Sequence, residues 1–121
     1  MSKYAADIKG TTANLQPGDF ICVMDLMYGM MLPSGNDAAQ VLAEFVGKRI
    51  HSGSGNSFAF INTFVAEMNR FAKHMQLTDT VYVNAHGMRA GNKSSAQDLS
   101  LLASYMCQEP ELEEICNTKS Y

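Results

Sequence analysis

Cysteine and histidine are residue types that bind metals and act as nucleophiles or bases, and the chain has three of each. They are Cys22, Cys107, Cys116, His51, His74 and His86. A zinc site needs paired ligands at short spacing, such as two histidines four residues apart on a helix. None of the six residues has such a neighbour, so the sequence predicts no metal site and no cofactor. We expect the cysteines to be three buried or half-buried thiols.

A hydroxyl and a carboxamide flank a glycine at Ser34-Gly35-Asn36, directly after Pro33. A serine hydroxyl accepts and donates hydrogen bonds, so it can pass a proton, and a carboxamide can orient a substrate. Gly35 allows the backbone to turn tightly between them. The structural alternative is that Ser34 and Asn36 cap a helix. We interpret Asp37 as a first-turn acid favoured by the helix dipole, and His86, beside a glycine turn, as structural.

Helices are predicted on both sides of this tripeptide. Apolar residues recur at helical spacing from Val23 to Leu32, and Pro33 ends that helix. A second helix is expected from Asn36 or Asp37 to Val46. Its buried face consists of Ala38, Val41, Leu42 and Phe45.

The rest of the sequence predicts further helices joined by short connections. Gln16-Pro17-Gly18-Asp19 is a turn that closes a short extended or hairpin-like N-terminal segment. A flexible loop over 51–57 precedes a long amphipathic helix over 58–75, and residues 80–83 suit a short strand or an extended segment. Ser95 opens another helix, and Pro110 begins a short last one. The apolar face of the Ser95 helix is predicted at Leu99, Leu102, Ala103 and Met106.

Composition and length place these elements in one globular domain. Hydrophobic residues make up 46% of the 121 residues and charged residues 17%, which excludes a disordered chain. The net charge of -3 gives no basic surface for nucleic acid. No apolar stretch reaches the roughly 20 residues that span a membrane, and residues 1–9 contain no signal-peptide core. We therefore expect a mainly α fold of about five helices, as a single helical domain over residues 1–121.

The segment around Ser34-Gly35-Asn36 resembles the central motif of D-alanyl-D-alanine carboxypeptidases, the low-molecular-mass penicillin-binding proteins of the serine β-lactamase-like superfamily. The resemblance runs from Asp25 to Ala39 and continues in order along nearly the whole chain. Its other segments are Gly10–Ala13, Leu15–Asp19, Asn84–Met88, Ser95–Leu99 and Asn117–Tyr121. One departure is Cys22, which stands where the family usually has a Thr or Ser cap, so the helix start is expected to be weaker by about 1 kcal/mol.

The family uses a Ser-x-x-Lys, a Ser-x-Asn and a Lys-Thr-Gly, and only the Ser-x-Asn is present here. The residues three positions before a lysine are Ala6, Phe45, Arg70, Ala90 and Cys116, and none is serine. Lys93 and Lys119 are each followed by serine, but neither begins a Lys-Thr-Gly or Lys-Ser-Gly. The catalytic serine, its lysine and the strand-edge motif are therefore absent from residues 1–121.

The resemblance implies the helical lobe of the penicillin-binding protein transpeptidase-like fold, expected here as a fragment without its sheet lobe. It implies acyl-enzyme hydrolysis of peptidoglycan stem peptides, with Ser34 and Asn36 as catalytic residues. Ser34 would pass a proton toward the leaving amine, Asn36 would bond the substrate carbonyl and the catalytic lysine, and Gly35 would complete the substrate-binding turn.

Two hypotheses about function stay open. In the first, the chain is part of a serine-type carboxypeptidase, inactive alone, that binds D-Ala-D-Ala peptides or β-lactams only when the missing lobe is supplied. In the second, it is a non-catalytic helical binding or structural module whose exposed docking face calls for a partner or self-association. The compartment is also open, because the family works outside the cytoplasmic membrane and no signal peptide is present.

Overall fold

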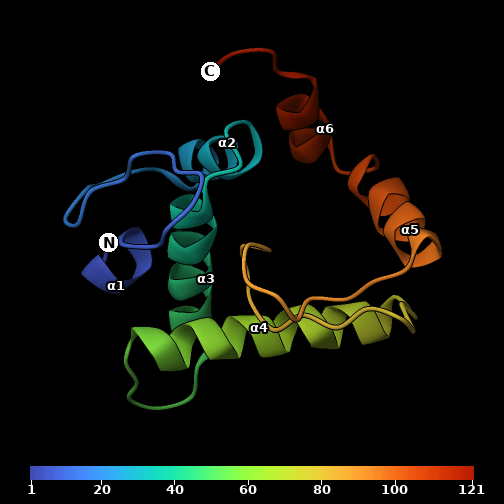
Figure 1. The fold of residues 1–121 in the computed structure, drawn as a ribbon, viewed down its shortest axis with the longest axis horizontal. Helices are drawn as coiled ribbons and strands as arrows, with labels where there is room; N and C mark the ends of the chain where they lie inside the picture. The colour runs from blue at the N-terminus through green and yellow to red at the C-terminus, as the bar shows by residue number, and fades with distance from the viewer.

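The computed structural model describes residues 1–121, which form six helices and no strand. The helices are α1 (Lys3–Ala6), α2 (Val23–Met31), α3 (Asn36–Ile50), α4 (Ser57–His74), α5 (Ala96–Met106) and α6 (Pro110–Asn117). Figure 1 shows α3 between α2 and α4, whereas α5 and α6 follow an arc from the region of α4 back toward α2. The predicted mainly α fold is confirmed.

Helix α3 is the centre of the packing. It contacts α1, α2 and α4. The core cluster joins three of its residues, Ala38, Val41 and Leu42, to Ala5 of α1 and Leu26 of α2. Because this apolar surface leaves water when the helices meet, α3 supports the N-terminal half of the chain.

Gly47 allows the closest approach between α3 and α4. A methyl group at this position would overlap the backbone carbonyl of Phe60 on α4. Glycine has no side chain to occupy that space, so the two helices can pack backbone against backbone.

Side-chain caps fix where four of the helices begin. On α1 the Ser2 Oγ accepts from the Ala5 N–H at 3.1 Å. The Asn56 Oδ1 accepts from the Ala59 N–H at 3.0 Å, and the Ser95 Oγ accepts from the Asp98 N–H at 3.2 Å. The Cys22 Sγ takes the same position on α2, at 3.4 Å from the Asp25 nitrogen. A thiol is a weaker hydrogen-bond acceptor than a hydroxyl. The thiol cap of α2 therefore forms, and it is of the weak kind that the sequence predicted.

Several predictions about local structure are wrong. Helix α1 was not predicted, because a four-residue helix is too short to show apolar periodicity. Of the two alternatives predicted for residues 80–83, the short strand does not form, and Val81 pairs with Lys93 only through an isolated bridge. All three cysteines are exposed rather than buried: Cys22 lies at the start of α2, Cys107 directly after the end of α5, and Cys116 on α6.

The buried face of α5 also differs from the prediction. Leu99 is 53% exposed, and the buried residue of this helix is Asp98. Its Oδ2 accepts from the Asp79 N–H at 2.9 Å and from the Thr80 hydroxyl at 2.7 Å. Helix α5 is therefore held to the 79–80 turn by a carboxylate rather than by a leucine stripe.

The last residue returns to α2. The ring of Tyr121 stacks on Tyr28 with centroids 3.8 Å apart, and its hydroxyl donates a hydrogen bond to Asp25. That bond, followed by desolvation, raises the pKa of Tyr121 to about 12. No helix of the protein combines the length and apolar character needed to cross a membrane.

Candidate functional site

Ser34 lies in the short connection between α2 and α3. Its backbone has a φ of 58°, in the left-handed region that L-residues other than Asn and Asp rarely adopt. The Thr11 hydroxyl donates to its carbonyl oxygen at 2.5 Å, which holds this conformation. The Ser34 side chain is exposed, and its hydroxyl makes no hydrogen bond within the chain. It is free to bond a group from outside.

Gly35 is required for close packing and not for its backbone conformation, because its φ of −67° suits any residue. Its N–H donates to the Gly29 carbonyl at 3.1 Å, and a methyl group here would overlap that carbonyl oxygen. The turn after α2 can therefore close only with glycine at this position.

Asn36 is the first residue of α3 and is 6% exposed. Its backbone N–H donates to the Thr11 carbonyl at 2.9 Å. Its Nδ2 donates to the Lys9 carbonyl at 3.3 Å and to the Thr11 hydroxyl and the Met88 thioether, each at 3.5 Å. Because a backbone carbonyl can only accept, the nitrogen must face Lys9. The carboxamide oxygen accepts no hydrogen bond.

Asp37 fixes the position of the N-terminal segment beside this turn. The carboxylate is fully buried and accepts from the Thr12 hydroxyl at 2.6 Å and from the N–H groups of Ala13, Leu15 and Ala38 at 2.8, 3.0 and 2.9 Å. Burial alone would raise the pKa of Asp37, but these four donors outweigh it and lower the pKa below its ordinary value. Its contacts make it a positioning residue rather than a reacting group.

The structure thus brings the two predicted catalytic residues into one turn, with Ser34 exposed and Asn36 largely covered. Sequence reasoning missed their supports, Thr11 and Met88, because neither stands at a recognisable spacing from the tripeptide.

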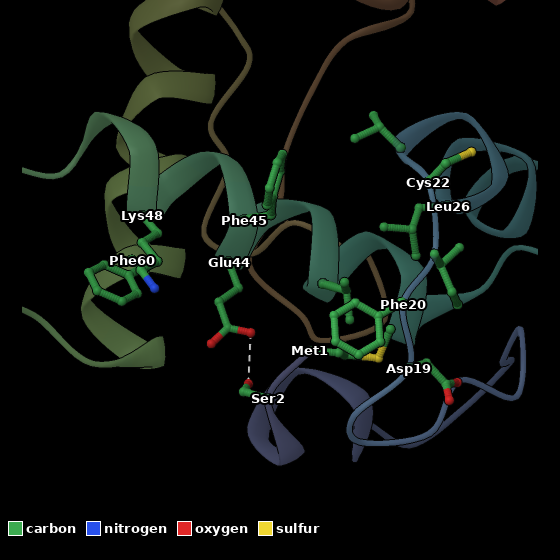
Figure 2. A pocket seen from close by; sticks show the side chains of 13 residues that line it. Met1, Ser2, Asp19, Phe20, Cys22, Leu26, Glu44, Phe45, Lys48 and Phe60 are labelled. Carbon is green, nitrogen blue, oxygen red and sulfur yellow. Dashed lines mark hydrogen bonds between the residues drawn. The ribbon is translucent and has the colours of Figure 1, made fainter.

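A cavity of about 800 Å³ lies away from this turn, between residues 1–2, residues 19–26, α3 and Phe60 of α4. Figure 2 shows Phe20, Leu26 and Phe45 on its walls, with the Ser2 hydroxyl donating to Glu44 at 2.7 Å on one side. Neither Ser34 nor Asn36 lines it. The cavity was not predicted, because its lining comes from four separate segments.

A second cavity of about 200 Å³ lies between α3, α4 and the loop after Val83. It contains His86, whose pKa is lowered by burial and, to a smaller extent, by the charge of Arg89. The prediction that His86 has a structural role fits one of its contacts, because its Nδ1 accepts from the Met88 N–H at 3.2 Å.

The comparisons with known proteins concern the whole chain. A family model described as D-alanyl-D-alanine carboxypeptidase matches residues 1–121. The chain belongs to the D-alanyl-D-alanine carboxypeptidase family. The resemblance inferred from the segments around Ser34-Gly35-Asn36 is thereby confirmed.

Curated members of the D-alanyl-D-alanine carboxypeptidase family align with nearly all of the chain. The carboxypeptidase of Streptomyces sp. (strain K15) is 35% identical over 121 residues, 99% of this chain and 40% of its own length. Bacillus subtilis DacF is 31% identical over 118 residues, 97% of this chain and 28% of its own. Escherichia coli DacC is 37% identical over 109 residues, 88% of this chain and 24% of its own. The chain therefore spans 40% or less of the length of these relatives.

Solved structures of the family share the fold. The Streptomyces K15 DD-transpeptidase superposes with a TM-score of 0.82 at 34% identity, over 93% of this chain and 41% of that protein. The carboxypeptidase DacD of Francisella tularensis gives a TM-score of 0.80 at 31% identity, over 94% of this chain and 25% of that protein. The helical arrangement of Figure 1 is thus found within larger members of the family.

Proposed function

We propose that residues 1–121 form the Ser-x-Asn-bearing helical lobe of a serine-type D-Ala-D-Ala carboxypeptidase. In this proposal the lobe supplies one wall of a cleft in which a peptidoglycan stem peptide or a β-lactam acylates a serine. The nucleophile, its lysine and the strand-edge motif come from residues outside this chain. The chain alone is inactive, because its 121 residues contain neither Ser-x-x-Lys nor Lys-Thr-Gly.

The observation that carries the proposal is that the Asn36 carboxamide oxygen and the Ser34 hydroxyl, two residues apart in one turn, both lack a hydrogen-bond partner within the chain. An amide oxygen can accept from a lysine ammonium and hold it near the nucleophile. The Ser34 hydroxyl can accept a proton on one side and donate one to the leaving amine on the other.

The Asn36 nitrogen has a further role in this proposal. One of its three acceptors is the Met88 thioether, which is a weak acceptor. A substrate carbonyl would replace the thioether without disturbing the contacts to Lys9 and Thr11. Binding of substrate then requires Met88 to move, and Met88 is 54% exposed.

A chimera tests the proposal directly. This chain replaces the matching segment of the Streptomyces K15 DD-transpeptidase, which supplies the missing elements. We expect a fluorescent penicillin to label the chimera covalently and not the isolated chain. Ser34→Gly, which removes the hydroxyl and tolerates the positive φ, should slow acylation by about 10²- to 10⁴-fold. Asn36→Ala should slow it to a similar extent.

Ser100→Ala is the matched control, because its exposed hydroxyl lies on α5 and donates only to the Gln97 carbonyl. Circular dichroism establishes that each chimera is folded. Acylation of the Ser34→Gly chimera at the parent rate would refute the proton-relay role, and labelling of the isolated chain would refute the requirement for a second lobe.

A further inference from the structure

The cavity of about 200 Å³ between α3, α4 and the 83–90 loop is lined by both apolar and polar residues. We call it the Gln40 cavity. Its apolar lining includes Phe58, Ile61, Val65 and Val83. Its polar lining includes Gln40, His86 and Arg89, and no carboxylate lines it. None of the residues proposed to act in acyl transfer belongs to it.

Gln40 is a buried side chain without a partner. The residue is 8% exposed, yet its carboxamide makes no hydrogen bond with the protein. No fully enclosed polar side-chain atom of the protein lacks a partner, so the Gln40 nitrogen and oxygen open into the cavity. A molecule that binds there displaces the water at this amide and must supply hydrogen bonds in its place.

His86 adds a donor whose tautomer is fixed. Its Nδ1 accepts from the Met88 N–H at 3.2 Å, so the neutral ring carries its proton on Nε2. Burial and then Arg89 lower its pKa, which keeps the ring neutral at pH 7. Nε2–H therefore remains a donor across neutral pH.

Arg89 supplies an uncompensated positive charge at the rim. Its guanidinium forms no ion pair and no hydrogen bond, since the ion pair of the protein joins Arg70 and Glu67. A guanidinium offers two parallel N–H groups that match a carboxylate. A charge, two neutral donors and an apolar wall thus surround one small space.

We propose that the Gln40 cavity binds a small carboxylate with a short branched apolar body. The carboxylate lies between the Arg89 guanidinium and the donors of Gln40 and His86, and the apolar body lies against Ile61 and Val65. At the roughly 30 Å³ that each water occupies in the liquid, the cavity holds a ligand of about seven non-hydrogen atoms. Isovalerate has this size and chemistry and serves as the probe.

The test titrates sodium isovalerate into the nitrogen-15-labelled chain and follows amide resonances of residues 83–90 and of the Gln40 side chain. We expect saturable shifts confined to these groups. Arg89→Gln should weaken binding about tenfold, because one charge-assisted pair is lost. Arg49→Gln is the matched control, since Arg49 stacks over Phe45 away from the cavity and its loss should leave binding unchanged.

A second variant separates binding from folding. Gln40→Met keeps the side-chain volume and removes an unpartnered amide, so the thermal midpoint without ligand should not fall. The increase in that midpoint caused by isovalerate should be abolished. The absence of saturable shifts, or unchanged binding by Arg89→Gln, would overturn the proposal. Equal binding of isovaleramide or of inorganic phosphate would overturn it as well, because charge and an apolar body are both required.

These outcomes are independent of acyl transfer. Isovalerate binding is measured on the isolated chain and penicillin labelling on the chimera, so either proposal can fail while the other stands.

Discussion

At the scale of single residues, Asp37 determines the geometry of the Ser34–Asn36 turn. Four donors converge on its buried carboxylate and hold residues 12–15 against the start of α3. Asp37→Asn replaces one carboxylate oxygen by an NH₂ group, which cannot accept hydrogen bonds from the donors that surround it. We expect a loss of about 2–3 kcal/mol in the free energy of unfolding at pH 7, measured by urea denaturation.

The pH dependence of stability should identify the same residue. The folded pKa of Asp37 is lowered from its ordinary value of 3.8, so its contribution is complete above pH 3.8 and is lost as the pH falls through the folded value. Asp37→Asn should lack this acid-dependent loss. Asp79→Asn is the control, because the Asp79 carboxylate is exposed and accepts no hydrogen bond; identical acid profiles for wild type and Asp37→Asn would contradict the assignment.

The candidate turn itself could be predicted from the sequence, but its accessibility could not. Ser34 and Asn36 were found because they stand between a helix-ending proline and an apolar helix. The exposure of the Ser34 hydroxyl depends on a left-handed backbone, and the covering of Asn36 depends on Met88, 52 residues away. Local spacing carries no information on such distant contacts.

At the scale of elements, the α3–α4 pair depends on Gly47. Gly47→Ala gains about 1 kcal/mol in helix propensity but places a methyl group against the Phe60 carbonyl. Backbone cannot move as a side chain does, so we expect a net loss of about 2 kcal/mol in the free energy of unfolding. Urea denaturation followed by circular dichroism measures it.

Gly29→Ala is the comparison for this prediction. It is also a helical glycine, and the nearest atom to the added methyl group is the Ala13 Cβ at 3.1 Å. This contact is only slightly too close, whereas the methyl group at Gly47 would overlap the Phe60 carbonyl oxygen, so the cost at Gly29 should be smaller. An equal or smaller loss for Gly47→Ala would show that the helices are free to separate.

The long helices could be predicted because their apolar faces repeat over several turns. The long helix predicted over 58–75 corresponds to α4, and the helix predicted over 23–32 corresponds to α2. Helix α5 differs because its buried anchor is a charged residue, Asp98, whereas the apolar Leu99 is exposed. Periodicity predicts burial from residue type, so it fails where a carboxylate with specific donors does the anchoring.

At the scale of the whole molecule, the arc of α5 and α6 is attached near both of its ends. Asp98 joins α5 to the 79–80 turn, and the rings of Phe71 and Tyr105 meet edge to face with centroids 5.7 Å apart. Helix α6 contacts α2, and Tyr121 stacks on Tyr28. The C-terminal third therefore depends on a few side-chain contacts rather than on a continuous core.

Tyr121→Phe tests the last of these contacts, since it keeps the stacked ring and removes the hydroxyl. The pKa of Tyr121 is raised from 10.0 to about 12, so its stabilising effect is present below pH 10 and is lost as the pH rises toward 12. The variant should have a thermal midpoint that depends less on pH across this range, as measured by circular dichroism. Tyr4→Phe, on the N-terminal helix, is the control, and a parallel profile for Tyr121→Phe and wild type would contradict the prediction.

The central position of α3 has a consequence for how this sequence can change in length. The start of the helix carries Asn36, its middle carries Gln40 and its end carries Gly47, and each faces a different neighbour. One inserted residue would rotate everything after it by about 100°, because a turn contains 3.6 residues. Insertions within α3 would thus misalign the turn, the cavity and the crossing with α4 together, whereas the 51–56 connection can lengthen without that effect.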